Sequence, residues 1–109
     1  MGIPEKLERA ISIRQPHAEE ILRRRKRNEY RSWLTHVRGR VYLYACLRAD
    51  DNNIKALPRG MIVGSVEIVG CNTDEDGGFA WNLARPRRYR KAVKPLGTPQ
   101  PGFWRPTFD

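Results

Sequence analysis

The sequence predicts an α+β domain that is mainly β, built as a small β-barrel with one principal short helix and minor helical turns. Three observations support this fold class. Several apolar segments have the two-residue period of β-strands, glycine or proline turns separate them, and only one segment has helical spacing. The 109 residues suffice for one compact core but not for two, so residues 1–109 are expected to form a single domain.

The first predicted elements are a strand and the principal helix. Residues 9–14 alternate between the two faces of a short strand. Pro16 then opens the helix, because proline is favoured at the first helical position. The apolar stripe of this helix consists of Ala18, Ile21 and Leu22.

The rest of the chain is predicted to form mainly strands. These strands cover residues 28–34, 40–47, 61–71 and 85–94. Two single helical turns are expected over residues 50–57 and 79–84, the second of them ended by Pro86. Residues 95–109 are rich in proline, which allows either a final edge strand or a tail packed across the barrel.

The charge of the chain is strongly positive. Lys and Arg number 21 against 12 Asp and Glu, a formal charge of +9. Two basic blocks, residues 23–27 and 85–94, hold much of the excess. Such blocks favour polyanionic partners, because binding them releases counterions. The alternative is a protein-interaction domain whose charge only confers solubility.

Other classes of protein find little support in the sequence. Cys46 and Cys71 stand alone, without a CxxC pair or a nearby pair of histidines, so neither a zinc site nor a disulfide scaffold is expected. No segment is long and apolar enough for a membrane span, and no signal peptide is recognisable. The expectation is a soluble cytoplasmic protein without metal or cofactor.

Several segments carry a family resemblance. Residues 11–18 read ISIRQPHA, and residues 26–33 read KRNEYRSW. Together with blocks at 39–45, 58–64, 80–83 and 86–88, they resemble the ASCH domain family. The family pattern has a glycine, a lysine two residues later, a glutamate or similar residue three further on, and often an arginine. Lys26, Glu29 and Arg31 match this pattern, whereas Arg24 stands at the glycine position.

The resemblance implies a PUA-like β-barrel with a cleft between the barrel and the helix. It also implies recognition of RNA or of modified bases. Some family members resemble hydrolases that act on RNA or on acylated cytidine nucleosides. In the latter members a threonine nucleophile occupies the position that is Glu29 here, and a carboxylate cannot replace a hydroxyl in acyl transfer without a change of mechanism.

The candidate site is a polar pocket formed by Lys26, Glu29, Arg31 and Glu67. Glu29 and Arg31 are two apart on a predicted strand and therefore share a face, where they either pair structurally or contact a base and a phosphate. Glu67 lies in an apolar strand and needs a partner, for which Lys26 and Arg31 are the candidates. The alternative for Glu67 is a surface ion pair on a half-exposed face of the barrel. For the hydrolase alternative, the catalytic candidates are Lys26, Glu29 and Glu67.

A phosphate-binding rim is predicted around this pocket. Its basic members are Arg23, Arg25, Arg85, Arg87, Arg88 and Arg90, and Tyr89 adds an aromatic ring. Trp104 is expected to be partly exposed and to stack on a base. Trp33 and Trp81 are expected in the core, and His17 and His36 in solvent. RNA or another single-stranded nucleic acid is the expected partner, because bases must be accessible to enter a pocket.

Overall fold

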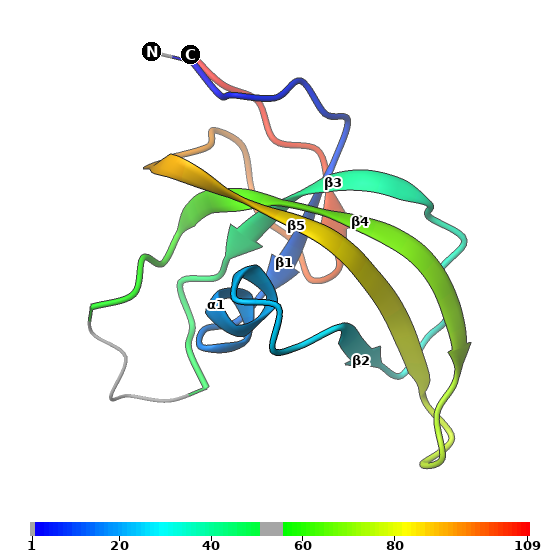
Figure 1. Cartoon of the computed structure of the whole chain (residues 1–109). Coiled ribbons are helices and arrows are strands. Elements are labelled where there is room, and N and C mark those ends of the chain that lie inside the picture. Colours follow the sequence, from blue (N-terminus) through cyan, green and yellow to red (C-terminus); the bar gives the residue numbers. More distant parts are fainter. Residues whose placement is uncertain (1, 51–55) are drawn as a thin grey trace.

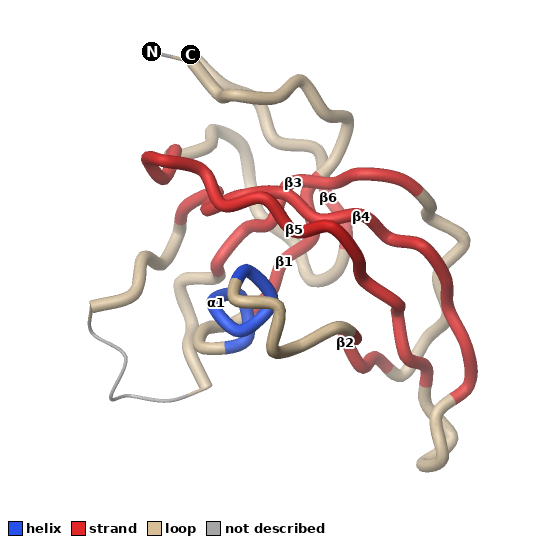
Figure 2. The backbone as a smooth tube through the Cα atoms, in the orientation of Figure 1, coloured by secondary structure: helices blue, strands red, loops and turns tan. Residues whose placement is uncertain are grey.

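The structure is a computed structural model, described here for residues 2–50 and 56–109, and it consists mainly of strands (Figures 1 and 2). The elements in chain order are β1 (Ala10–Ile13), α1 (His17–Leu22), β2 (Asn28–Arg31), β3 (Gly39–Ala45), β4 (Met61–Thr73), β5 (Phe79–Val93) and β6 (Phe103–Trp104). The prediction of a mainly β domain with one short helix is confirmed. Part of the helical turn expected over residues 50–57 lies outside the described residues.

The six strands form one curved sheet in the order β2-β5-β4-β3-β1-β6. β1 pairs with β3 in parallel, and the other neighbours are antiparallel. The long strands β4 and β5 bend so that the sheet curls into a half-barrel (Figure 1). The side chain of Arg31 on the edge strand β2 donates to the carbonyl of Ser12 on β1, which links the two sides of the half-barrel.

The larger of two core clusters lies between the curved sheet and α1. Ala18 and Ile21 of the helix are buried in one cluster with residues of the sheet. Trp81 is fully buried there and stacks on Phe103 with ring centroids 5.1 Å apart, which confirms that Trp81 is a core residue. Removal of this apolar surface from water is the main force that holds the helix on the sheet.

The helix begins and ends as its local sequence requires. The side-chain carbonyl of buried Gln15 accepts a hydrogen bond of 3.0 Å from the amide of Glu19, which satisfies one of the unpaired donors of the first turn. Pro16 immediately precedes the first helical residue, close to its predicted place. Arg24, at the position of the family glycine, adopts a φ of 64°, so the tight turn after α1 forms although the glycine is absent.

The helical turn predicted over residues 79–84 is wrong, because this segment begins the strand β5, which continues through Pro86. The register of β4 and β5 shifts between Ser65 and Glu67, where β5 contains one extra residue. Arg85 has a φ of 49° at this bulge. A bulge leaves residues outside the ladder and therefore tolerates proline, which has no amide hydrogen to donate.

The C-terminal segment returns to the sheet. Phe103 and Trp104 form β6, which pairs with β1, so the edge-strand alternative for residues 95–109 is confirmed. Gly102 brings this segment close to β1, and its carbonyl accepts a hydrogen bond of 2.9 Å from the amide of Ser12. The segment 99–101 that precedes β6 consequently lies beside the end of β1, where the candidate site opens.

Candidate functional site

A cleft of about 610 Å³ opens at the ends of β1 and β3, between β2, the start of α1 and the segment before β6. This volume is in the range of pockets that hold small molecules, roughly 300–1,000 Å³. The ionisable residues that line it include Arg14, His17, Lys26, Glu29, Arg31 and Asp50. The cleft therefore contains three of the four residues predicted to form the polar pocket.

The carboxylate of Glu29 contacts two cationic side chains in the cleft. Its Oε1 lies 3.4 Å from Nζ of Lys26, and its Oε2 accepts a hydrogen bond of 3.1 Å from Nε of Arg31. Glu29 and Arg31 share a side of β2 because they are two residues apart, and Lys26 lies in the turn that leads into this strand. The three side chains are only 12% to 21% exposed, so solvent screens their charges less than at an open surface.

His17 extends the charged cluster toward the other wall. Its Nδ1 lies 3.2 Å from Nζ of Lys26, and its Nε2 lies 3.1 Å from a carboxylate oxygen of Asp50. A tautomer protonated on Nε2 suits both contacts, since it donates to Asp50 and accepts from Lys26. A hydrogen bond from Arg14 holds the pKa of Asp50 below its usual value, and Asp50 consequently remains ionised.

Several members of this site were not predicted from the sequence. His17 was expected to be a solvated residue, yet its ring, although partly exposed, contacts two charged side chains in the cleft. Its place at the first residue of α1, separated from the end of β1 by three residues, was the available signal. Asp50 carried no such signal, because its approach to His17 depends on the path of the chain after β3.

Aromatic and apolar side chains form the rest of the cleft. The ring of Tyr30 is 56% exposed, and Nζ of Lys26 lies 6.0 Å from its centre. The ring of Tyr44 is buried, and Leu47 and Pro99 add apolar surface. Burial raises the pKa of the Cys46 thiol, so this cleft residue is not a thiolate at neutral pH. An exposed aromatic ring beside charged donors is a suitable surface for stacking a nucleobase.

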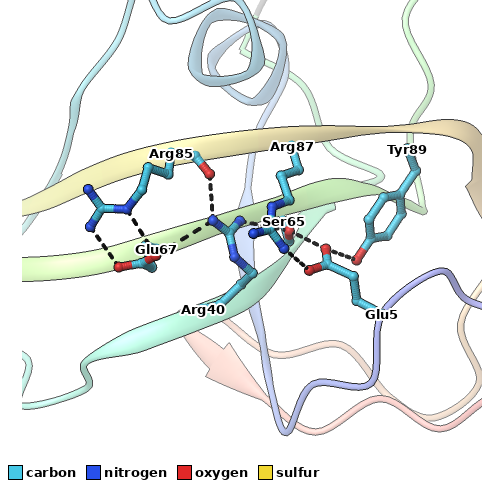
Figure 3. A network of polar contacts seen from close by, with 7 residues as sticks. All are labelled: Glu5, Arg40, Ser65, Glu67, Arg85, Arg87 and Tyr89. Atoms are coloured by element: carbon cyan, nitrogen blue, oxygen red, sulfur yellow. Dashed lines mark hydrogen bonds and ion pairs between the residues drawn. The ribbon is translucent and has the colours of Figure 1, made fainter.

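Glu67 does not belong to the cleft. Its carboxylate accepts hydrogen bonds of 3.0 and 2.7 Å from Arg85 and lies 3.7 Å from Arg40 (Figure 3). The expected pairing with Lys26 or Arg31 is therefore wrong, and the alternative of a surface ion pair is confirmed. The bulge in β5 brings Arg85 to Glu67, and a sequence pattern does not reveal such a bulge. The hydrogen bonds from Arg85 lower the pKa of Glu67, which fits a structural ion pair.

The same polar network anchors the N-terminal segment to the sheet (Figure 3). The carboxylate of Glu5 accepts hydrogen bonds from Ser65, from Tyr89 at 2.9 Å and from Arg87 at 2.7 Å. Burial raises the pKa of Tyr89, and its hydroxyl therefore stays protonated and donates to Glu5. Arg87 and Tyr89 were predicted in the rim, but Tyr89 is 7% exposed and cannot offer its ring to a base.

Trp104 also differs from its prediction. Its side chain is buried, at 7% exposure, and it meets Tyr44 edge to face with ring centroids 5.1 Å apart. The expectation of an exposed stacking ring is wrong, because β6 pairs with β1 and places Trp104 against the sheet. Trp33, expected in the core, is 46% exposed, although it contacts Trp81 edge to face.

The two basic blocks meet at Glu19 of α1. This carboxylate accepts a hydrogen bond of 2.6 Å from Arg23 in the first block and bonds of 2.9 and 2.8 Å from Arg88 in the second. Both arginine side chains remain about half exposed. Part of each block thus lies on one side of the molecule. Arg25 pairs with Glu20 at 3.8 Å, and Arg90 is exposed further along β5.

Replacing Glu19 by Gln is expected to lower the free energy of unfolding at neutral pH by about 1 kcal/mol, the size of a partly screened charged hydrogen bond. The bonds from Arg88 hold the folded pKa of Glu19 below 4.5. Its stabilisation is therefore complete above pH 4.5 and is lost as the pH falls through the folded pKa. Denaturant unfolding at a series of pH values measures this effect. The difference in the free energy of unfolding between variant and wild type should become smaller as the pH falls.

Glu75→Gln is the matched control for this measurement, since Glu75 is exposed and forms no ion pair within the described chain. It should leave the unfolding midpoint unchanged at every pH. If the loss of unfolding free energy in Glu19→Gln stayed constant down to acid pH, it would contradict the assigned role of this carboxylate.

Within residues 2–50 and 56–109, the structure brings together no group of three or more His, Cys, Asp or Glu side chains that could hold a metal ion. In the same residues, no helix has both the length and the apolar character needed to cross a membrane.

Comparison with known proteins supports the family resemblance. The family model described as the ASCH domain matches residues 11–90, which include α1, β2, β3 and β4 and most of β1 and β5. All the cleft residues discussed above, except Pro99, fall in this range. No curated protein gives a significant match to the sequence.

Proposed function

Because the chain belongs to the ASCH domain family, we propose that it binds RNA, with a nucleobase in the cleft and the phosphates on the basic side of the molecule. The observation that carries the proposal is the cluster of Lys26, Glu29 and Arg31 in a cleft large enough for a nucleoside. Such a cleft requires an unpaired base, so single-stranded or looped RNA is the preferred ligand.

The polar groups of the cleft offer mainly hydrogen-bond donors to a base edge. Lys26 supplies ammonium donors, and Arg31, held by Glu29, supplies planar guanidinium donors. Glu29 acts chiefly as a positioning residue, because a cation contacts each of its carboxylate oxygens. The exposed ring of Tyr30 provides the stacking surface. In other proteins, alanine substitution of such a ring lowers the binding free energy by about 1–3 kcal/mol per base.

The basic side of the molecule supplies affinity that does not depend on sequence. Arg23 and Arg88 share one carboxylate and keep about half of their side-chain surface accessible to phosphates. Arg25 and Arg90 add further exposed charge. Contacts of this kind position the RNA strand, whereas contacts in the cleft discriminate among bases.

A hydrolase of RNA or of a modified nucleoside is the second candidate, favoured by the contact of His17 with Lys26 and Asp50. In this mechanism the attacking hydroxyl gives its proton to Nζ of Lys26 as Lys26 passes one of its own protons to Nδ1 of His17. Asp50 stabilises the imidazolium that results, and the same relay in reverse returns the proton to the leaving group. Glu67 takes no part, because it lies with Arg85 and Arg40 outside the cleft. Glu29 stands at the position of the threonine nucleophile of some family members, and here it would orient Lys26 instead of attacking the substrate.

The proposal predicts salt-sensitive binding of single-stranded RNA. Labelled single-stranded RNA, duplex RNA and single-stranded DNA should be titrated at two salt concentrations, and the recovered strands should be examined for cleavage. Single-stranded RNA is expected to bind most tightly and to stay intact, and its affinity should fall steeply with salt because each bound phosphate releases counterions. Cleavage by the wild type would favour the hydrolase, and absence of binding at low salt would favour a protein-interaction domain.

A further inference from the structure

A second hollow of about 230 Å³ lies next to the cleft, between the turn after α1 and the bulge of β5. Ile21, Val66, Leu83, Ala84 and Pro86 supply its apolar lining, and its charged lining residues are Arg24, Lys26, Arg27 and Arg85. Lys26 lines both cavities. The amide of Leu83 donates to the carbonyl of Arg27 at 2.8 Å, which fastens the turn to the strand at this place.

The charge of this hollow is unbalanced. Most arginines of the two basic blocks have a carboxylate partner: Arg23 and Arg88 share Glu19, Arg25 contacts Glu20, Arg85 binds Glu67 and Arg87 binds Glu5. Arg24 and Arg27 are exposed, and within the described residues their guanidinium groups form neither an ion pair nor a hydrogen bond. No aspartate or glutamate lines the hollow.

Two unusual backbone conformations border the same hollow. Among the described residues, Arg24 and Arg85 are the two non-glycine residues with positive φ, at 64° and 49°. The left-handed region costs an ordinary residue about 1–2 kcal/mol, a cost that glycine avoids. Arg24 therefore accepts a conformational cost at the position of the family glycine and adds a guanidinium group to the wall of the hollow.

We propose that this hollow binds a phosphate of the RNA strand together with its ribose, next to the nucleotide whose base enters the cleft. The inference rests on the proposed function. The hollow is smaller than the roughly 300–1,000 Å³ of pockets for whole ligands, which suits a sugar phosphate rather than a complete nucleotide. Arg24 and Arg27 bind the phosphate oxygens, and the apolar floor contacts the ribose. Lys26, between the two cavities, links phosphate binding to base binding.

The test compares the double variant Arg24→Gly and Arg27→Gln with the wild type. Labelled single-stranded RNA is titrated over a series of salt concentrations, and phosphate-free nucleosides are titrated at low salt. The variant should bind RNA about 10-fold more weakly at low salt. The slope of log affinity against log salt should become shallower by about 0.7, the value for the one phosphate charge that the variant no longer neutralises. Any nucleoside affinity should be unchanged, because the cleft is intact.

The matched control is Lys6→Gln with Arg105→Gln, which removes two positive charges from exposed residues outside both cavities. Its slope should stay within about 0.3 of the wild-type slope. Thermal unfolding verifies the fold of the double variant, which glycine at position 24 should support. A double variant with the wild-type slope, while a change at Lys26 still weakens binding, overturns this inference and leaves the proposed function standing. A wild type that binds no RNA overturns both.

Discussion

Replacing Lys26 by Ala is expected to weaken binding of single-stranded RNA by about 10- to 100-fold. The change removes a charged donor from a partly desolvated cleft, and a hydrogen bond from such a donor contributes about 1.5–3 kcal/mol. Lys26 also lines both cavities, so its removal affects base and phosphate binding together. Fluorescence titration of labelled RNA at constant salt measures the effect.

The fold should survive this change, because Glu29 keeps its hydrogen bond from Arg31 after Lys26 is removed. Lys6→Ala is the matched control, since it removes the same charge from an exposed position outside both cavities and both basic blocks. It should alter affinity less than about twofold, the modest effect of a single solvent-screened charge. Equal decreases in affinity for the two variants would show that Lys26 contributes only to the overall charge, and would remove it from the site.

Gly64→Ala is expected to lower the free energy of unfolding by at least about 3 kcal/mol, at the upper end of typical overpacking effects. A Cβ atom at this position would lie 2.1 Å from the carbonyl oxygen of Arg87 on β5 and 3.0 Å from a methyl group of Leu22 on α1. A backbone carbonyl inside a sheet cannot rotate away as an exposed side chain can. The strands β4 and β5, or the helix above them, would have to move apart.

Chemical denaturation followed by far-ultraviolet circular dichroism measures this decrease in stability. Gly2→Ala is the matched control, because a Cβ atom there meets no other atom within 4 Å, and its unfolding midpoint should equal that of the wild type. A Gly64→Ala variant with a wild-type midpoint would contradict the close contact of α1, β4 and β5. If this variant does fold, weaker RNA binding is also expected, since α1 carries His17 and precedes Lys26.

The sequence determined much of the architecture, because local patterns control local structure. Alternation of apolar residues predicted most of the strands, although their ends differ by a few residues, and the spacing of Ala18, Ile21 and Leu22 predicted the helix. The lysine, glutamate and arginine of the family pattern predicted a cluster of three charges, which adjacent positions on a turn and a strand bring together. The net charge predicted a basic surface.

Tertiary structure decided which other residues join that cluster. The bulge at Arg85 and Pro86 keeps β5 in the sheet where proline indicated the end of a helical turn, and it brings Arg85 to Glu67 outside the cleft. The chain path after β3 brings Asp50 to His17. Pairing of β6 with β1 buries Trp104 instead of exposing it. Each of these contacts joins residues far apart in sequence, and a pattern of neighbouring residues contains no information about such distances.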